Sequence, residues 1–357
     1  MMKKLSMKIV SFLKHKSLKF NLILLFLSIE FSTSVAQNYS SVLPFFQDTA
    51  LLNIKIVAPF ESIISDDCKN PQNFQGSLIY FENGNERIIP VELKKRGKFR
   101  CNQENCSFPP LFIKFDKKKV KGSVFEGLNK IKLVNCCKIE DKKYETYVLK
   151  EYLVYRLFRQ LSDTSFATRL LKVTYINSNQ PENSMTRFAF AIEDDDDMAK
   201  RLNAKVIKAS LVSTKDTDSS QRLLVEMFQY MIGNTDVSIP QSHNVEILIT
   251  NPHQPLLVVP YDFDWSRMVN PPYAKPALEG KIKAQRQFLG ECYSDTLLLS
   301  TARIFQKKEQ NLLNTLRLFP YLSSKEKKVM EEHLINFYKN LDNQKTFFEV
   351  FKAPCHQ

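Results

Sequence analysis

Residues 231–267 read MIGNTDVSIPQSHNVEILITNPHQPLLVVPYDFDWSR, and their pattern predicts how this half of the chain folds. Hydrophobic residues recur at helical spacing through residues 222–233, and Gly233 is a natural end for the predicted helix. The runs VEILIT at 245–250 and LLVVPY at 256–261 are typical of two strands joined by a short turn. We therefore expect a helix, a polar loop and then a β-hairpin.

Three polar side chains mark the ends of these elements. Asp236 lies in the loop, Asn244 precedes the first strand and Asp262 follows the second. A loop aspartate can accept the proton of an acceptor hydroxyl, and an asparagine with a second aspartate can hold the ion that bridges nucleotide phosphates. Hard oxygen ligands of this kind select Mg²⁺ or Mn²⁺. The pattern favours phosphoryl transfer, although carboxylates and amides also cap turns.

The motifs GNTDVS, HN and YDFDWS resemble the catalytic loop and metal-binding segment of the CotH-type kinases, the spore coat protein H family. They are more distantly similar to HipA-type and lipid-kinase-like enzymes. The resemblance runs from about residue 94 to residue 292. It implies that Asp236 is the catalytic aspartate, and that Asn244 and Asp262 are metal ligands for ATP with Mg²⁺ or Mn²⁺. Related loops often carry His or Lys near the catalytic aspartate, where this chain has Val-Ser.

The fold class that this resemblance implies is α+β, a two-lobed atypical protein-kinase-like fold. Residues 37–193 would form a β-rich N-terminal lobe with one long helix at 144–161. Residues 194–357 would form a mainly helical C-terminal lobe with the catalytic loop and the metal-binding hairpin. Hydrophobic stripes at 296–319 and 325–341 predict two of its helices.

The N-terminal half alternates short hydrophobic runs with turns. Asn83-Gly84 between two such runs is a strong signal for a type I′ hairpin. The basic stretch KKRGKFR at 94–100 is either a basic turn or, by the resemblance, an element near the nucleotide. The expected strands are residues 51–57, 77–82, 87–93, 111–115, 130–134, 168–176 and 187–192.

Two charged residues of this half are candidates for a phosphate clamp. Lys132 alternates with hydrophobic neighbours in a strand, so its ammonium could reach the α- and β-phosphates. Lys114 shares this pattern, and the resemblance favours Lys132. Glu151 of the long helix matches the glutamate that pairs with such a lysine, although each charge could equally face solvent. By the same resemblance, backbone groups of Ile192 and Glu193 could bind the adenine edge at the lobe junction.

The N-terminus has the features of an export signal. It combines a lysine-rich start, a hydrophobic run at 20–29 that is too short to cross a membrane, and Ser-Val-Ala at 34–36. We expect residues 1–36 to be removed and the protein to be periplasmic, on the cell surface or secreted. An uncleaved membrane anchor is the alternative. No later hydrophobic run has the length of a membrane span.

The formal net charge is +13, and +8 remains without the six Lys and one Glu of the leader. A basic face attracts polyanions. No basic motif interleaved with aromatic residues is present, so no specific nucleic acid is expected as a partner. The implied partner is a protein substrate that the sequence does not identify.

An exported chain with seven cysteines permits disulfides. Cys101 and Cys106 could close a small loop, and either cysteine of the adjacent pair 136–137 could join Cys68 or Cys292. The connectivity stays open. A zinc site built from the four central cysteines is a rival, although an adjacent pair is poorly spaced for tetrahedral zinc.

With the resemblance, these features predict an exported kinase that transfers phosphate from ATP to a protein hydroxyl. The chain has only 8 glycines and neither GxGxxG nor GxxxxGK[ST], so two common phosphate-binding loops are absent. ATP is scarce outside the cytoplasm. The alternative is therefore a catalytically inactive, kinase-like binding protein of the envelope or surface.

Overall fold

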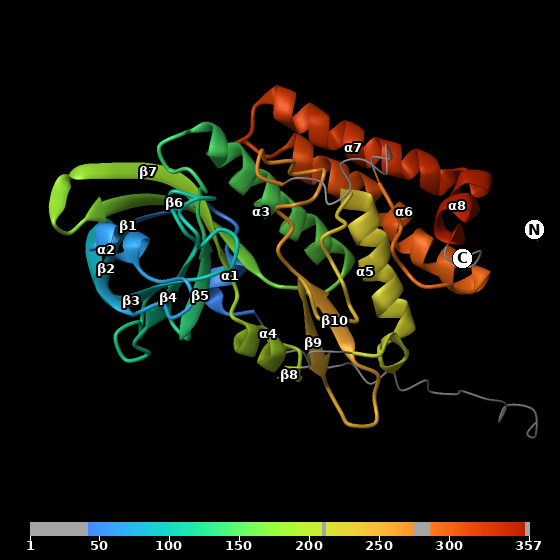
Figure 1. Cartoon of the computed structure of the whole chain (residues 1–357), viewed down its shortest axis with the longest axis horizontal. Coiled ribbons are helices and arrows are strands. Elements are labelled where there is room, and N and C mark those ends of the chain that lie inside the picture. The colour runs from blue at the N-terminus through green and yellow to red at the C-terminus, as the bar shows by residue number, and fades with distance from the viewer. Residues whose placement is uncertain (1–41, 209–211, 275–285, 354–357) are drawn as a thin grey trace, which may run out of the picture. The chain divides into compact units, whose positions relative to one another are not determined.

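The computed structural model describes residues 42–208, 212–274 and 286–353, all within one compact unit of residues 39–357. In this part of the chain seven strands close into a barrel in the order β1-β2-β3-β4-β5-β7-β6 (Figure 1). They are β1 (Leu52–Ala58), β2 (Phe74–Glu82), β3 (Asn85–Lys95), β4 (Leu111–Phe115), β5 (Lys130–Val134), β6 (Thr168–Asn177) and β7 (Gln180–Ile192).

The barrel closes through a parallel pair. Strands β1 and β6 pair in register from Leu52↔Leu171 to Ala58↔Asn177, whereas the other neighbouring strands are antiparallel. The expected two-lobed, kinase-like α+β fold is therefore wrong. Alternating hydrophobic residues predict that a segment is a strand, but they do not predict its partner, and closure depends on two strands that lie far apart in the sequence.

The second half of the chain combines helices with a small sheet. Its strands β8 (Lys205–Ile207), β9 (Val245–Ile249) and β10 (Leu257–Pro260) are ordered β10-β9-β8, so this half is not purely helical. The described helices are α1 (Pro44–Gln47), α2 (Phe60–Ser65), α3 (Lys143–Leu161), α4 (Asp195–Arg201), α5 (Ser219–Ile232), α6 (Asp295–Arg317), α7 (Ser324–Asp342) and α8 (Gln344–Phe351), with the 3₁₀ helix η1 (Thr214–Asp216). Helix α3 packs against both β7 and α6, and thus joins barrel to helices.

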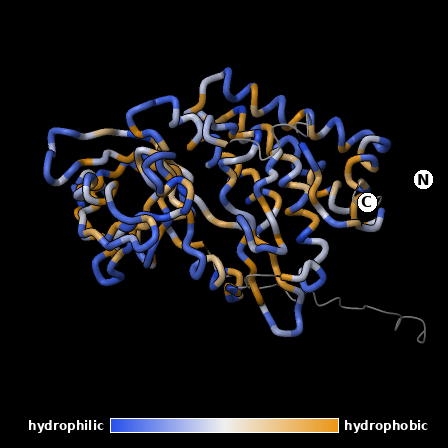
Figure 2. Tube along the Cα trace, in the orientation of Figure 1, coloured by the Kyte–Doolittle hydropathy of each residue, from blue (hydrophilic) through white to orange (hydrophobic). Residues whose placement is uncertain are grey.

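Two hydrophobic clusters fill the molecule. One lies within the barrel, around residues such as Phe125 and Leu133. The other extends from the outer side of the barrel to the helices, and includes Tyr152, Phe190 and Phe228. The far end of the β6–β7 hairpin is hydrophilic (Figure 2). That hydrophilic end explains why residues 177–186 were expected to form a loop, although β7 already begins at Gln180.

Most local predictions are confirmed. Gly233 ends α5 in the left-handed conformation (φ 66°), and Asn83 and Gly84 have positive φ (52° and 80°), as a type I′ turn requires. Strands β4 and β5 have the expected bounds, and α3 begins one residue earlier than expected. Helix α8 was not predicted.

The prediction of at least one disulfide is confirmed, but the pairings considered are wrong: Cys101 does not pair with Cys106, and neither Cys136 nor Cys137 joins Cys68 or Cys292. The pairs are Cys68–Cys101 and Cys106–Cys137, and Cys292 is also disulfide-bonded. A zinc site from the central cysteines is thus contradicted. In the described ranges, no helix is both long and apolar enough to cross a membrane. The predicted signal at residues 1–36 lies outside the described residues.

Candidate functional site

The open end of the β9–β10 hairpin brings two predicted ligands together. Asn244 directly precedes β9, and one residue, Tyr261, separates β10 from Asp262. The N–H of Tyr261 donates to the Asn244 carbonyl at 3.0 Å. Both Asn244 and Asp262 have left-handed backbones, with φ of 55° and 59°. Such conformations cost about 1–3 kcal/mol in a residue other than glycine and gather at functional sites.

Asp236 is held by two side chains from the end of its own loop. Its Oδ1 lies 2.9 Å from His243 Nε2, and its Oδ2 accepts from Asn244 Nδ2 at 2.9 Å. Asn244 Nδ2 also donates to the Asp236 carbonyl at 2.7 Å. Backbone hydrogen bonds between Ser238 and His243 close the loop. The Asp236 carboxylate is therefore oriented, and its side chain stays 35% exposed to a substrate.

The turn after β10 is anchored through its hydrophobic residue. Phe263 is fully buried, with ring centroids 4.7 Å from Tyr155 and 5.6 Å from Phe228. The N–H of Asp262 donates to the Tyr155 hydroxyl at 2.9 Å. The N–H of Arg267 donates to the Gly233 carbonyl at the end of α5. The loop after α5 thus holds the carboxylate of Asp236, and the turn after β10 holds that of Asp262. The hydrogen bond between Arg267 and Gly233 keeps these two segments next to each other.

A buried arginine lies between two buried carboxylates beside this turn. Arg100 Nη1 is 3.8 Å from Glu151 Oε2 and 3.8 Å from Asp264 Oδ2, and the Tyr273 hydroxyl donates to Asp264 at 3.0 Å. Arg100 also donates to the carbonyl of Asn135. Glu151 is therefore paired with Arg100, from the KKRGKFR stretch, and not with Lys132.

The pKa values of this cluster reflect crowded negative charge. Burial and then the neighbouring Asp264 raise the pKa of Glu151 well above its usual value. Burial and Asp262 raise the pKa of Asp264 to about 7, with Arg100 opposing. Burial works against the charge of Arg100, but the acidic groups around it raise its pKa. An additional cation would relieve the repulsion among these carboxylates.

Lys132 is buried on β5 and forms an ion pair with Asp195. Its Nζ lies 4.7 Å from the ring centroid of Phe166 and 5.6 Å from that of Tyr261. Burial lowers the pKa of Lys132, and Asp195 acts in the opposite direction. Lys114, the alternative, is exposed and pairs with Glu92 at 3.2 Å.

The two residues expected at the adenine edge have other partners. Ile192 pairs with Lys132 on one side and with Thr168 on the other, within the barrel. Glu193 is 1% exposed and accepts from Arg201 through both carboxylate oxygens, at 3.0 and 2.9 Å. The strand pairing of Ile192 and the ion pair of Glu193 with Arg201 therefore stabilise the chain at the end of β7.

Sequence reasoning missed His243, Arg100 and Tyr273. The signal for His243 is its place next to Asn244, and the signal for Arg100 is its place in the basic stretch KKRGKFR. Arg96, from that same stretch, lies over the ring of Phe112 and acts on the site through its charge. Its charge opposes the rise in pKa that burial causes in Glu151 and in the tyrosines of positions 155 and 261.

The open end of the β9–β10 hairpin offers two side-chain oxygen donors to a metal ion, from Asn244 and Asp262. Within the described ranges, no three His, Cys, Asp or Glu side chains are arranged to hold one. Asp262 supplies a carboxylate, and Asn244 has its Oδ1 available because both of its side-chain hydrogen bonds use Nδ2. This set fits a hard ion that brings further oxygen ligands from a bound phosphate.

The sequence matches no protein-family model, and no curated protein matches it significantly.

Proposed function

We propose that the protein transfers a phosphoryl group from ATP to a hydroxyl group of a protein substrate, with Mg²⁺ or Mn²⁺. The observation that carries the proposal is the contact of Asp236 with Asn244, at the hairpin end that also presents Asp262. The motifs that resemble CotH-type kinases agree with this chemistry. The proposal rests on the site and not on a kinase-like fold.

Each residue has a defined task in this proposal. Asp236 accepts the proton of the acceptor hydroxyl, and His243 and Asn244 orient its carboxylate. Asn244 Oδ1 and the Asp262 carboxylate would hold the metal ion. That ion would neutralise charge on the phosphates. Arg96 or Lys132 would contact the phosphates, and Lys132 would first have to leave Asp195.

We also propose that the protein acts outside the cytoplasm. Its two described disulfides are typical of an oxidising compartment, and the lysine-rich leader fits export. The alternative is a catalytically inactive protein that binds a partner at the envelope or surface. Two ion pairs favour it, because Lys132 is paired with Asp195 and Glu151 with Arg100, and the two residues expected to form a phosphate clamp are therefore not paired with each other.

Two variants with different expected defects test the proposal. Asp262→Ala should abolish metal-dependent ATP binding, because the ion loses its carboxylate ligand. Asp236→Ala should retain ATP binding and lose transfer by about a hundred- to ten-thousand-fold, because only the base is removed. Calorimetric titration with Mn²⁺-ATP and phosphate incorporation from labelled ATP measure the two properties.

Asp67→Ala is the matched control, since Asp67 is exposed in the loop after α2. It should leave binding and transfer unchanged. A wild-type chain that binds no nucleotide with either metal would overturn the proposal and leave the binding protein. ATP binding without transfer, unaffected by Asp236→Ala, would indicate an inactive relative of a kinase.

A further inference from the structure

Two exposed hydrophobic side chains lie together on the outer wall of the barrel, in the β2–β3 hairpin. Tyr80 and Ile89 point into the barrel and are buried, whereas Phe81 and Ile88 point outward and are 59% and 60% exposed. Ile79 pairs directly with Ile88, so Phe81 and Ile88 are diagonal neighbours on the outer face. This wall is turned away from α5–α8 (Figure 1).

Positive charge borders these side chains on both sides. On β1, Lys55 pairs in register with Ile79, and its Nζ lies 6.0 Å from the centroid of the Phe81 ring. On the other side, Arg87 Nη2 donates to the Gly122 carbonyl at 3.4 Å. That hydrogen bond ties the hairpin to the lysine-rich turn that follows β4.

This turn carries three lysines without a partner in the fold. Lys118, Lys119 and Lys121 are exposed, and none of them forms an ion pair with a described residue. The carboxylates of Asp116 and Glu126 accept backbone N–H groups of the same turn, at 2.9 and 3.1 Å. The three ammonium groups therefore remain available to an anion outside the molecule.

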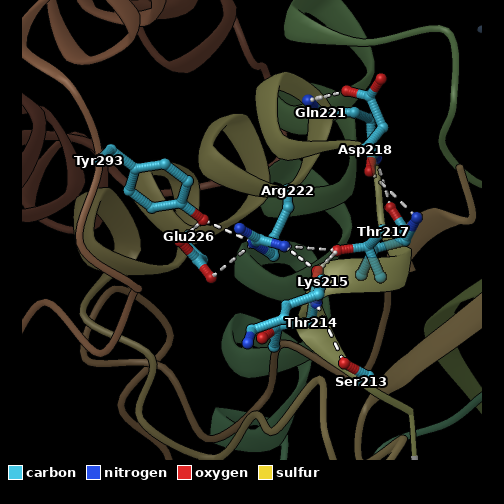
Figure 3. Close-up of polar contacts among 10 residues, drawn as sticks. Ser213, Thr214, Lys215, Thr217, Asp218, Gln221, Arg222, Glu226 and Tyr293 are labelled. Carbon is cyan, nitrogen blue, oxygen red and sulfur yellow. Dashed lines mark hydrogen bonds and ion pairs between the residues drawn. The ribbon is translucent and has the colours of Figure 1, made fainter.

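Other basic side chains have their partners within the molecule. Figure 3 shows Arg222, whose Nε donates to the Tyr293 hydroxyl at 2.6 Å and lies 3.7 Å from Glu226. The charge of Lys117 opposes the rise that burial causes in the pKa of Asp197, so this lysine interacts with α4. Neither side chain is part of the surface considered next.

The described chain begins beside the same turn. Phe45 of α1 stacks on Phe125, which follows the lysines, with ring centroids 5.2 Å apart. The sequence before α1 contains the predicted export signal with its hydrophobic run at 20–29. The segment that would bring the chain to a membrane therefore joins the barrel next to these lysines.

We propose that this face binds the surface of a membrane that contains anionic phospholipids. Its lysines attract the phosphate headgroups, and its two hydrophobic side chains enter the boundary between headgroups and acyl chains. A closed barrel offers no free strand edge to an extended peptide, which favours a lipid surface over a peptide partner. The proposal goes beyond phosphoryl transfer and does not depend on it. We call this face the outer patch; it consists of Lys55, Phe81, Ile88, Lys118, Lys119 and Lys121.

Co-sedimentation with lipid vesicles tests the outer patch. The chain from Gln37 onward is used, because it is the form expected after export and lacks the hydrophobic leader, which would bind lipid by itself. It should bind vesicles of phosphatidylglycerol mixed with phosphatidylcholine, and not vesicles of phosphatidylcholine alone. High salt should weaken the binding, because ions screen the attraction between lysines and headgroups.

Joint replacement of Lys118, Lys119 and Lys121 by glutamine should weaken vesicle binding about a hundredfold, because three attractions to the headgroups are lost. The matched control is the joint replacement by glutamine of three exposed lysines of α6 and α7, which removes the same net charge from another face. It should bind nearly as the wild type does. These control positions are Lys307, Lys325 and Lys339.

The hydrophobic part of the outer patch is tested separately. Phe81→Ser combined with Ile88→Ser should weaken vesicle binding about tenfold, because less apolar surface leaves water. Both side chains are exposed, so the variant should keep the fold. Leu318→Ser, at a leucine 79% exposed after α6, is the control and should bind as the wild type does.

Absence of wild-type binding to phosphatidylglycerol vesicles, or equal binding to phosphatidylcholine alone, would overturn the proposal. Equal losses in the two lysine variants, or no loss in the serine variant, would do the same. Polyglutamate that displaces the chain from vesicles at matched charge would instead indicate an acidic polypeptide partner, and would also overturn it. If a joint variant does not fold, Lys119→Gln and Phe81→Ser decide singly.

Discussion

Glu226 is a buried carboxyl whose ionisation is linked to folding. Burial raises its pKa from 4.5 to about 7, with the hydrogen bond from Tyr293 and the charge of Arg222 opposing and that of Glu291 adding to the rise. The folded chain therefore binds more protons than the unfolded chain between these two pH values. Stability should consequently fall as the pH rises from about 4.5 to about 7. The full shift corresponds to roughly 3 kcal/mol.

Glu226→Gln should make stability less dependent on pH, because the variant has no group to ionise there. Urea unfolding at pH 5 and pH 8 measures this dependence for both proteins. The exposed Glu332→Gln on α7 is the control and should behave as the wild type does. An equal loss of stability between the two pH values in wild type and Glu226→Gln would contradict the assignment.

Single residues of the candidate site were predictable only where their neighbours lie nearby in the sequence. Asp236, Asn244 and Asp262 were found because a helix, a loop and a hairpin place them in one order along the chain. The partners of Arg100 and Lys132 were not predictable. Each makes its ion pairs with residues about 50 or more positions away, so no local pattern identifies them.

Among the elements, the segment between β3 and β4 depends on covalent links. Residues 96–110 form neither helix nor strand, yet they carry Arg100 into the core. Two disulfides fix this segment, one to the loop after α2 and one to the residues after β5. The sequence indicated disulfides but not these pairs, because pairing follows from the spatial neighbours that barrel closure creates.

Replacing Cys106 and Cys137 together by alanine should lower the free energy of unfolding by about 2–4 kcal/mol, because the unfolded chain gains freedom. Urea unfolding followed by circular dichroism measures the change. Cys136→Ala is the control, since Cys136 is a free buried thiol next to the same bridge, and it should lose less. A double variant no less stable than this control would contradict a structural role for the disulfide.

At the scale of the molecule, the barrel and the helices share one hydrophobic cluster. The ring of Tyr152 on α3 lies 5.8 Å from that of Phe190 on β7 and 6.1 Å from that of Phe319 after α6. The seven barrel strands were predicted individually, but β8 and the cluster shared by barrel and helices were not, because both depend on contacts between segments far apart in the sequence. Because this cluster joins the outer side of the barrel to the helices, we expect barrel and helices to unfold in one cooperative step.

Two spectroscopic probes test this cooperativity. Trp265 is the only tryptophan and lies 5.5 Å from Phe99 at the site, whereas far-UV circular dichroism reports on all elements. Their urea transitions should coincide. Tyr152→Ala should shift both midpoints together, with a loss of roughly 3 kcal/mol or more, because it removes a buried ring between barrel and helices. Phe81→Ala, at a ring 59% exposed, should shift neither. Separate transitions, or a shift in only one probe, would instead mean that barrel and helices fold as independent units.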